Sequence, residues 1–311
     1  MAEAENVVRL RGVTKAFGRQ EAVSDLEFDL PAGTITGLLG PNGSGKTTTI
    51  RMILGILMPD RGTVAVFGQR PGRQSRTRAG YLPEERGLYR KMKVLDQLVF
   101  FGRIRGMARQ QAAERAREWL RRLGLGDREE ARADELSRGM QQKVQFIATV
   151  LHDPDLLVLD EPFSGLDPIN QDVLERIVLE YHQRGATILL STHLMDQAER
   201  ICQRVCLISG SRKVLDGDLA EIKRRERSGV VAIAFEGPDS WLSGPGVHEV
   251  MRTNGGARVV LEEGADPGAL LTRGLAAGAR FRRFEVLEPR LHELFLRHAG
   301  SGERRRTGGK G

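Results

Sequence analysis

A chain of 311 residues, 40% of them hydrophobic, is long enough for one large domain with a buried core and a second, small one. Its apolar stretches are only a few residues long, whereas a helix that spans a bilayer needs roughly 20, so no membrane span is expected. The net charge of +7 and the pI near 9.8 would suit a nucleic-acid partner, but the arginines are scattered among acidic residues along the chain. This distribution indicates a solvated surface and argues against a specific nucleic-acid partner.

Neither the N-terminus nor the cysteines indicate export. Residues 1–6 are acidic and lack the pattern of a secretion signal, so the cytoplasm is the expected compartment. Cys202 and Cys206 are four positions apart, a spacing that fits neither a metal site nor a disulfide framework. We expect both to be packing residues.

The N-terminal segment predicts strands followed by a strand, a loop and a helix. Apolar and polar residues alternate over 6–13 and 23–30, which is typical of antiparallel strands with one face toward solvent. Residues 34–39 are more continuously apolar and predict a strand, which ends at a glycine-rich turn before a predicted helix over 47–57. This order of elements is the setting that a phosphate-binding loop requires.

The middle of the chain predicts a helical insertion and then an alternation of helices and strands. Apolar residues recur at helical spacing over 93–123. Further elements are expected as helices over 137–151, 173–182 and 195–202 and as buried strands over 156–160 and 187–190. Such an alternation predicts an α/β fold with a mainly parallel sheet that is covered on both faces.

The C-terminal part predicts a small α+β domain after a charged linker over 223–227. Strands are expected near 230–235, 247–252, 258–262 and 282–286, and helices near 266–276 and 290–298. The predicted organisation is a large domain over 1–225 with a helical subdomain at about 88–150, an accessory domain over 226–300, and a disordered tail over 301–311.

The turn after the third strand fits the pattern of a phosphate-binding loop. Its glycines let successive backbone N–H groups point at a phosphate, and the next helix adds free N–H groups and partial positive charge. Lys46 is expected to reach the β- and γ-phosphates, and the Thr47 hydroxyl to bind Mg²⁺. The expected nucleotide-binding residues of this segment are Gly40, Pro41, Asn42, Gly43, Ser44, Gly45, Lys46, Thr47 and Thr48.

The apolar strand over 156–160 ends in two adjacent carboxylates, Asp160 and Glu161. Because successive strand residues point in opposite directions, the two side chains can act separately. Asp160 is expected to hold a metal ion, directly or through water, and Glu161 to polarise an attacking water. With the phosphate-binding loop, this pair predicts a site that binds a nucleoside triphosphate with Mg²⁺ and hydrolyses it.

Further motifs follow in an order that resembles the ATP-binding subunits of ABC transporters. Residues 136–142, Leu-Ser-Arg-Gly-Met-Gln-Gln, resemble the signature motif of that family, and residues 164–167 resemble its D-loop. Phe17 matches the aromatic residue that stacks on adenine, His193 matches the switch histidine, and Glu84 lies in a segment that resembles the Q-loop. The resemblance covers residues 1–220 and is closest to exporters of the sodium-efflux and drug-efflux type.

This resemblance implies a subunit that binds ATP and Mg²⁺ and drives a separate polytopic membrane subunit, with export as the expected direction. The subunit would lie at the cytoplasmic face of the membrane through that partner. In the family, two ATPase subunits form a head-to-tail dimer, and each ATP lies between the phosphate-binding loop of one and the signature motif of the other. The resemblance implies Glu161, His193 and Lys46 as catalytic residues, and Phe17, Ser137, Gly139 and Asp167 as further nucleotide contacts. The implied metal ligands are Thr47, Asp160 and Glu84.

The chain departs from the family pattern at three positions. The signature usually reads Leu-Ser-Gly-Gly-Gln, whereas Arg138 and Met140 occupy the third and fifth positions here. We expect Arg138 to face solvent, and Met140 cannot supply a side-chain amide. Glu84 replaces a glutamine that in the family contacts Mg²⁺ and senses the membrane subunit. Its carboxylate can still bind Mg²⁺ but adds negative charge near the other acids; the alternative, favoured by the mobility of such loops, is that it only relays contact to the membrane subunit.

Two other roles occur in the same superfamily. ATPases of translation carry two ATPase cores in one chain, whereas this chain has a single phosphate-binding loop. ATPases of DNA repair interrupt the core with a long heptad-patterned insertion, and no such pattern lies between Gly40 and Asp160. Both fit less well than transport. The transported substrate leaves no mark in this sequence, because the cargo path belongs to the membrane subunit.

Overall fold

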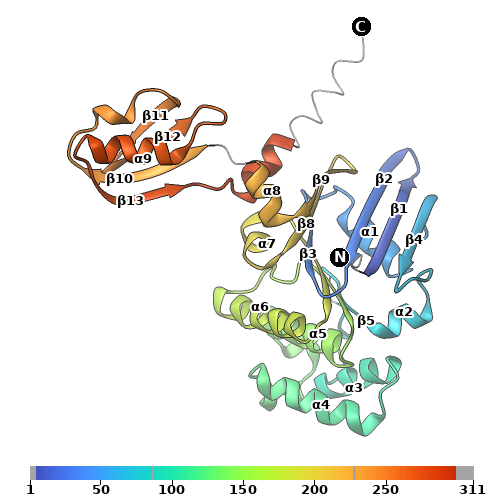
Figure 1. The fold of residues 1–311 in the computed structure, drawn as a ribbon. Coiled ribbons are helices and arrows are strands. Elements are labelled where there is room, and N and C mark those ends of the chain that lie inside the picture. The colour runs from blue at the N-terminus through green and yellow to red at the C-terminus, as the bar shows by residue number, and fades with distance from the viewer. Residues whose placement is uncertain (1–4, 86, 227–228, 299–311) are drawn as a thin grey trace. The chain divides into compact units, whose positions relative to one another are not determined.

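The computed structural model describes residues 5–85, 87–226 and 229–298, which divide into two compact units (Figure 1). The first contains the residues up to Asp218 together with His298, and the second runs from Leu219 to Arg297. The tail expected over 301–311 lies outside the described residues. Within the described ranges, no helix combines the length and the apolar character needed to cross a membrane.

A three-stranded antiparallel sheet contains the first strands of the chain, in the order β2-β1-β4. Its strands are β1 (Asn6–Phe17), β2 (Gln20–Pro31) and β4 (Arg61–Val66). Leu10 is buried whereas its neighbours Arg9 and Arg11 are exposed, which confirms the predicted strand with one face toward solvent. β1 continues beyond the expected end at residue 13 and places Phe17 next to the hairpin turn.

A six-stranded sheet forms the centre of the first unit, in the order β5-β6-β7-β3-β8-β9. Its strands are β3 (Ile35–Leu39), β5 (Ala79–Leu82), β6 (Leu156–Asp160), β7 (Thr187–Thr192), β8 (Arg204–Ser209) and β9 (Arg212–Asp218). All pairs are parallel except β8 with β9, and every residue of β3, β6 and β7 is buried. The sheet confirms the predicted α/β class. Its parallel strands end at one common edge, where the candidate site lies.

Helices lie on both faces of this sheet (Figure 1). Helix α1 (Lys46–Ile53) packs between the two sheets, and one hydrophobic core joins Leu10, Ile50 and Val158. The other helices of the first unit are α2 (Arg73–Arg78), α3 (Val94–Ile104), α4 (Arg109–Arg122), α5 (Arg138–Val150), α6 (Pro168–Gln183) and α7 (Met195–Ile201), with short 3₁₀ turns at Gly126–Arg128 and Ala133–Glu135. Helices α3 and α4 confirm the predicted helical insertion.

Two helix boundaries differ from the prediction for local reasons. Helix α1 ends at Ile53 and not at residue 57, because Gly55 adopts a left-handed conformation with a φ of 64°. Helix α6 begins at Pro168 and not at residue 173. The Asp167 side chain accepts a hydrogen bond from the Asn170 N–H at 3.0 Å, and Pro168 suits the first helical position.

The second unit contains a four-stranded antiparallel sheet in the order β11-β12-β10-β13. Its elements are α8 (Leu219–Arg225), β10 (Val230–Glu236), a 3₁₀ turn (Ser240–Leu242), β11 (Val247–Thr253), β12 (Gly256–Leu261), α9 (Pro267–Ala276) and β13 (Arg280–Val286), and residues 291–297 are helical. Trp241, Val259 and Leu270 belong to a core of its own, so the unit is the small α+β body that the sequence predicts.

The linker predicted over 223–227 is wrong in its first part. Residues 223–225 form the last turn of helix α8, in which Leu219 and Ile222 are buried. Basic side chains are favourable in the last turn of a helix, where the backbone carbonyls carry partial negative charge. Residues 227 and 228 lie outside the described residues.

The two cysteines are free and buried, as expected of packing residues. Cys202 follows α7 and Cys206 lies in β8, where it is part of the main core. Burial raises the pKa of the Cys202 thiol to about 12, which leaves it un-ionised at neutral pH.

Candidate functional site

The loop between β3 and α1 takes a shape that only glycine permits at one position. Gly45, directly before α1, has a φ of 108°, and a Cβ added there would lie 2.3 Å from the carbonyl oxygen of Ala22. No side chain in the described part of the chain caps the helix at this end. The first backbone N–H groups of α1 are therefore available to an anion.

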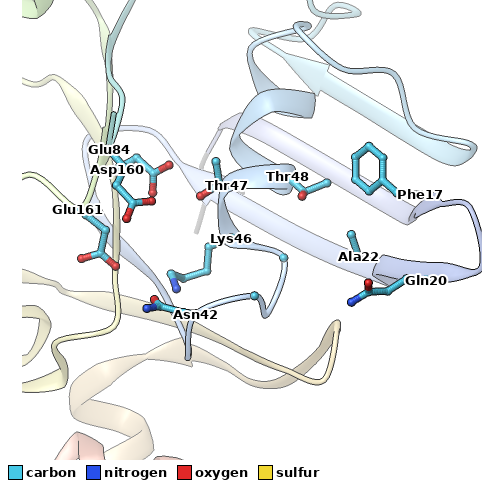
Figure 2. Close-up of a pocket in the computed structure, with 12 residues that line it drawn as sticks. Phe17, Gln20, Ala22, Asn42, Lys46, Thr47, Thr48, Glu84, Asp160 and Glu161 are labelled. Atoms are coloured by element: carbon cyan, nitrogen blue, oxygen red, sulfur yellow. The ribbon is translucent and has the colours of Figure 1, made fainter. Parts of the chain in front are cut away.

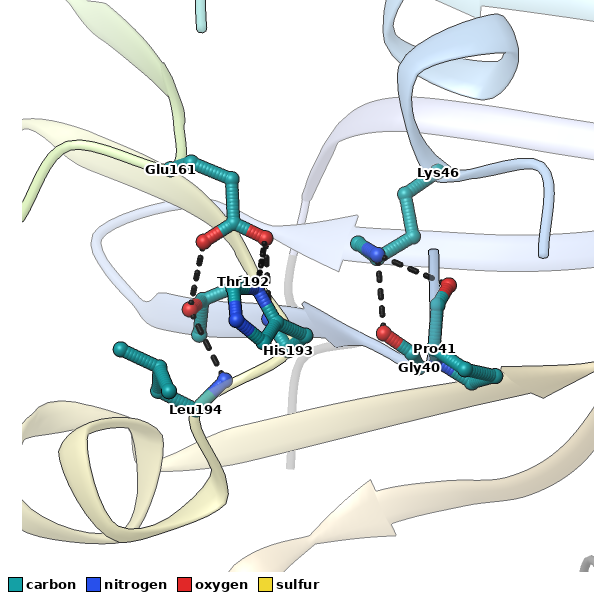
Figure 3. A network of polar contacts seen from close by, with 7 residues as sticks. All are labelled: Gly40, Pro41, Lys46, Glu161, Thr192, His193 and Leu194. Atoms are coloured by element: carbon teal, nitrogen blue, oxygen red, sulfur yellow. Dashed lines mark hydrogen bonds and ion pairs between the residues drawn. The ribbon is translucent and has the colours of Figure 1, made fainter. Parts of the chain in front are cut away.

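Lys46 begins α1, and its side chain folds back over the loop (Figure 3). The ammonium group donates hydrogen bonds to the carbonyl oxygens of Gly40 at 2.8 Å and Pro41 at 3.1 Å. Burial lowers the pKa of Lys46, while the negative charges of Glu161 and other nearby acids oppose that shift. Lys46 thus carries a poorly hydrated charge whose present partners are neutral carbonyl oxygens.

A cavity of about 480 Å³ runs along the loop (Figure 2). Phe17, which is 55% exposed, lies at one end, and Asp160 and Glu161 lie at the other, with Lys46 between them. The lining residues are Phe17, Gln20, Ala22, Asn42, Gly43, Gly45, Lys46, Thr47, Thr48, Glu84, Asp160 and Glu161. An aromatic ring, a cationic loop and a group of carboxylates, in this order, can contact the base, the phosphates and the metal ion of a nucleotide.

Asp160, the last residue of β6, is buried. Among the described residues, neither of its carboxylate oxygens makes a hydrogen bond of good geometry. Burial raises its pKa, and the nearby hydroxyls of Ser191 and Thr47 oppose the shift. Buried polar atoms that lack protein partners are commonly satisfied by an ion or water, and a carboxylate is a preferred ligand of Mg²⁺.

Glu161 follows Asp160 in a left-handed conformation, with a φ of 49° that is unusual for a residue other than glycine. Its carboxylate accepts hydrogen bonds from the Thr192 hydroxyl at 3.0 Å and from the backbone N–H of His193 at 3.0 Å (Figure 3). Nδ1 of His193 lies 2.8 Å from the same carboxylate. The end of β7 therefore fixes the orientation of Glu161.

Glu84 follows β5 and lines the cavity beside Asp160 (Figure 2). The two carboxylates come from neighbouring parallel strands, β5 and β6, which end at the same edge of the sheet. Burial raises the pKa of Tyr81 to about 12, and the charges of Asp160 and Glu84 add to this shift. The charge of Glu84 also opposes the lowering of the Lys46 pKa by burial, so Glu84 contributes to the electrostatics of the cavity.

The remaining predicted residues lie outside the cavity lining in the described structure. Gly40 and Pro41 accept hydrogen bonds from Lys46, and Ser44 is buried with its hydroxyl unpartnered. His193 reaches the site through Glu161. The others lie at helix starts: Ser137 caps α5, Gly139 is in its first turn, and Asp167 caps α6. One chain therefore does not bring the signature motif to its own phosphate-binding loop.

Sequence reasoning missed several contributors. Thr192 binds Glu161 from the end of β7, and the sequence does not show that β7 lies beside β6. Gln20 and Ala22 line the cavity from the start of β2, and no sequence signal points to them. Gln142 and Gln145 of α5 donate hydrogen bonds to the segments after β6 and β5, a contact that only the tertiary structure reveals.

Comparison with known proteins gives relatives over most of the chain. Residues 23–164 match the family described as ABC transporter, and residues 217–299 match the C-terminal domain of ATP-binding proteins similar to DrrA1-3. An uncharacterized ABC transporter ATP-binding protein of Bacillus subtilis, YhaQ, is 41% identical over 93% of this chain and 97% of its own length. The Nod factor export ATP-binding protein I of Burkholderia lata is 38% identical over 75% of this chain and 77% of its own.

Solved structures give the same result for the fold. The ATP-binding subunit of an ABC transporter superposes with a TM-score of 0.66 at 31% identity, over 70% of this chain and 92% of that one. A nucleotide-free ATP-binding cassette superposes with a TM-score of 0.61 at 24% identity, which supports the fold alone. The match to the Bacillus subtilis relative is long enough and similar enough in sequence to assign the family. The chain belongs to the family of ABC transporter ATP-binding proteins.

Proposed function

We propose that the chain binds Mg²⁺-ATP in the cavity along the phosphate-binding loop and hydrolyses it. The proposal rests on one observation: a single cavity has Phe17 at one end, Lys46 in the middle, and Asp160 and Glu161 at the other (Figure 2). Phe17 would stack on the adenine. Lys46 would exchange its bonds to neutral carbonyls for shorter, charge-assisted bonds to phosphate oxygens.

The groups around Asp160 fit a magnesium ion. Both oxygens of Asp160 are buried and unpartnered in the described structure, and the Thr47 side chain lies on the cavity wall beside it. Thr47 and Asp160 would hold the ion, with Glu84 as a further oxygen donor. When bound, the ion would offset the negative charge of the phosphates.

Glu161 would act as the general base. A carboxylate has about four acceptor sites, and Thr192 and His193 occupy three of them, which leaves room for a water. That water would attack the γ-phosphorus as its proton moves to Glu161 and the bond to the β-phosphate oxygen breaks. Thr192 and His193 would keep the carboxylate aimed at the water.

Two copies of the chain would complete each site. Ser137, Gly139 and Asp167 are typical of residues that contact ATP in this family, yet none of them lines the cavity of the described chain. A head-to-tail dimer would bring these residues of one copy to the phosphate-binding loop of the other. The Ser137 hydroxyl and the N–H groups at the start of α5 would then receive the γ-phosphate.

Mixing two inactive variants tests the hydrolysis and the composite site together. Lys46→Ala removes the phosphate contact, and Gly139→Asp places a negative charge at a position where a Cβ has room, its nearest neighbour being 3.8 Å away. Each variant alone should have lost Mg²⁺-dependent ATPase. A mixed dimer has one intact site, so the mixture should recover part of the activity. A mixture as inactive as its components would count against the shared site.

We further propose that the chain powers export through a separate membrane subunit and lies at the cytoplasmic face of the membrane. The relatives support this, since several are named Nod factor export ATP-binding protein. Purification of the protein from its own membranes should recover a polytopic subunit with it. The coupling would be refuted if no polytopic subunit were recovered, or if the recovered subunit did not change the ATPase activity.

A further inference from the structure

We propose that Gln145 is a positioning residue that holds the Glu84 carboxylate in the nucleotide cavity. Gln145 lies on helix α5, which begins at the signature motif, so it connects the backbone around Glu84 to that helix. Gln145 is buried, with 6% of its surface exposed. Its side-chain amide donates hydrogen bonds to the carbonyl oxygens of Pro83 and Glu85, each at 3.2 Å. These two carbonyls lie directly before and directly after Glu84, so one amide group holds the backbone on both sides of this residue.

Little else fixes Glu84 within the described part of the chain. β5 ends at Leu82. Among the described residues, no hydrogen bond from one backbone group to another involves Pro83, Glu84 or Glu85. No hydrogen bond or ion pair of the Glu84 carboxylate is present among the described residues, although the side chain lines the cavity. The position of the carboxylate therefore follows from its backbone, and Gln145 holds that backbone.

Helix α5, which carries Gln145, packs closely against β5. Thr149, one turn beyond Gln145, has its hydroxyl 3.2 Å from the Tyr81 carbonyl oxygen. A Cβ on Gly80 would lie 2.4 Å from the Thr149 carbonyl oxygen, so the helix and the strand approach more closely than any other residue would allow. The amide of Gln145 is thus presented from a rigid surface.

The same helix also contacts the segment after β6. Gln142, nearly one turn before Gln145, donates a hydrogen bond at 2.9 Å to the carbonyl oxygen of Pro162, which directly follows Glu161. Helix α5 begins at the signature motif, with Ser137 as its cap. The signature motif, Glu84 and Glu161 are therefore linked through one helix, and a displacement of α5 would move the backbone at Glu84.

This inference rests on the proposed binding of ATP. Its test measures the equilibrium affinity of the full chain for a fluorescent ATP analogue, once in the presence of Mg²⁺ and once in the presence of EDTA. A carboxylate near the phosphates repels free ATP, whereas in the metal complex it can contact the Mg²⁺ ion. Gln145→Met keeps the length of the side chain and removes both donors. It should reduce the ratio of the affinity with Mg²⁺ to the affinity in EDTA about three- to tenfold. A change of this size corresponds to the loss of one or two hydrogen bonds. Glu84→Ala should reduce the same ratio.

A double-mutant cycle identifies the route of the effect. In the Glu84→Ala background, Gln145→Met should change the ratio no further, because the carboxylate that it positions is gone. A Gln145→Met effect that is equally large in that background would overturn the proposal. If Gln145→Met does not fold, Gln145→Asn, whose amide is too short to reach both carbonyls, replaces it.

Tyr181→Phe is the matched control for lost stability. The Tyr181 hydroxyl donates a hydrogen bond at 3.1 Å to the carbonyl oxygen of Val150, the last residue of α5, and neither residue lines the cavity. This variant also loses one buried side-chain-to-carbonyl bond, so its Tm should fall while its affinity ratio stays unchanged. If Gln145→Met lowers only the Tm, its role is structural and the inference is wrong.

Backbone order parameters from ¹⁵N relaxation separate this inference from the proposed function. The order parameters of the Glu84 and Glu85 amides should be lower in Gln145→Met than in the unmodified chain and in Tyr181→Phe, because the loop is released. Equal order parameters in all three would overturn the positioning role. If the unmodified chain failed to bind ATP, the proposed function would fall, whereas lower order parameters in Gln145→Met would still support the hold on Glu84.

Discussion

Oε1 of Glu161 lies 2.8 Å from Nδ1 of His193, and the backbone N–H of His193 donates to the same oxygen at 3.0 Å. The histidine therefore contacts the carboxylate through both its ring and its backbone, while Thr192 binds the other oxygen. Glu161 also adopts a left-handed φ of 49°. Such a backbone is retained where the surrounding structure fixes it, and here it aims an otherwise flexible side chain.

Replacement of Glu161 by Gln should separate binding from hydrolysis. The amide keeps the shape of the side chain but cannot take a proton, so we expect ATPase turnover to fall at least ~10²-fold, as for the loss of a general base. Affinity for ATP should be retained, and the variant should accumulate as an ATP-bound dimer in gel filtration. Hydrolysis at nearly the unmodified rate would mean that another group, with His193 the first to consider, is the base.

Replacement of Lys46 by Ala should abolish tight nucleotide binding. The ammonium group is buried, and a charge held away from water interacts with phosphates several times more strongly than an exposed one. Lys46→Met serves as the control for packing, since it keeps the length of the side chain without the charge. Both variants should bind ATP weakly in equilibrium titrations. Unchanged affinity in Lys46→Met would show that the charge is unnecessary and would remove the interpretation of this segment as a phosphate-binding loop.

The sequence predicted those elements whose signal is local. β6 is observed over Leu156–Asp160, as predicted, because a short run of apolar residues ends at charged ones. Helix α8 was missed because its charged residues hide the two buried positions, Leu219 and Ile222, on one face. β9 was missed because it is a largely polar edge strand that is defined by its pairing with β8.

The candidate site was predictable as a set of residues and not as an arrangement. Strand order in the sheet places β5, β6 and β7 side by side, and this order cannot be read from local patterns. The contact of Glu161 with Thr192 and the hold of Gln145 on the backbone around Glu84 both follow from it. Local sequence identifies groups with suitable chemistry, whereas the topology decides which of them meet.

Replacement of Glu84 by Gln should change the response to Mg²⁺. The carboxylate lies beside Asp160 on the cavity wall, so the change removes a negative charge and keeps an oxygen (Figure 2). We expect the variant to need about three- to tenfold more Mg²⁺ for half-maximal ATPase, and to bind free ATP more tightly in EDTA because a repulsion is lost. An unchanged Mg²⁺ requirement, with a reduced stimulation by the membrane subunit, would instead assign Glu84 to coupling.

The stability of the first unit should depend on pH through His152, which follows α5. Its Nε2 lies 3.2 Å from the Ala79 carbonyl oxygen, its Nδ1 is buried without a partner among the described residues, and burial lowers its pKa to about 4. In the unfolded chain this histidine takes up a proton near its ordinary pKa of 6.5, whereas the folded protein resists protonation until about pH 4. The unfolded state therefore binds more protons in that window, and the free energy of unfolding should fall by up to about 3 kcal/mol as the pH is lowered from 6.5 to 4. Urea unfolding followed by circular dichroism should show a flatter profile for His152→Leu, and the original slope for the exposed control His248→Gln; an equal slope in both variants would assign the pH dependence to other groups.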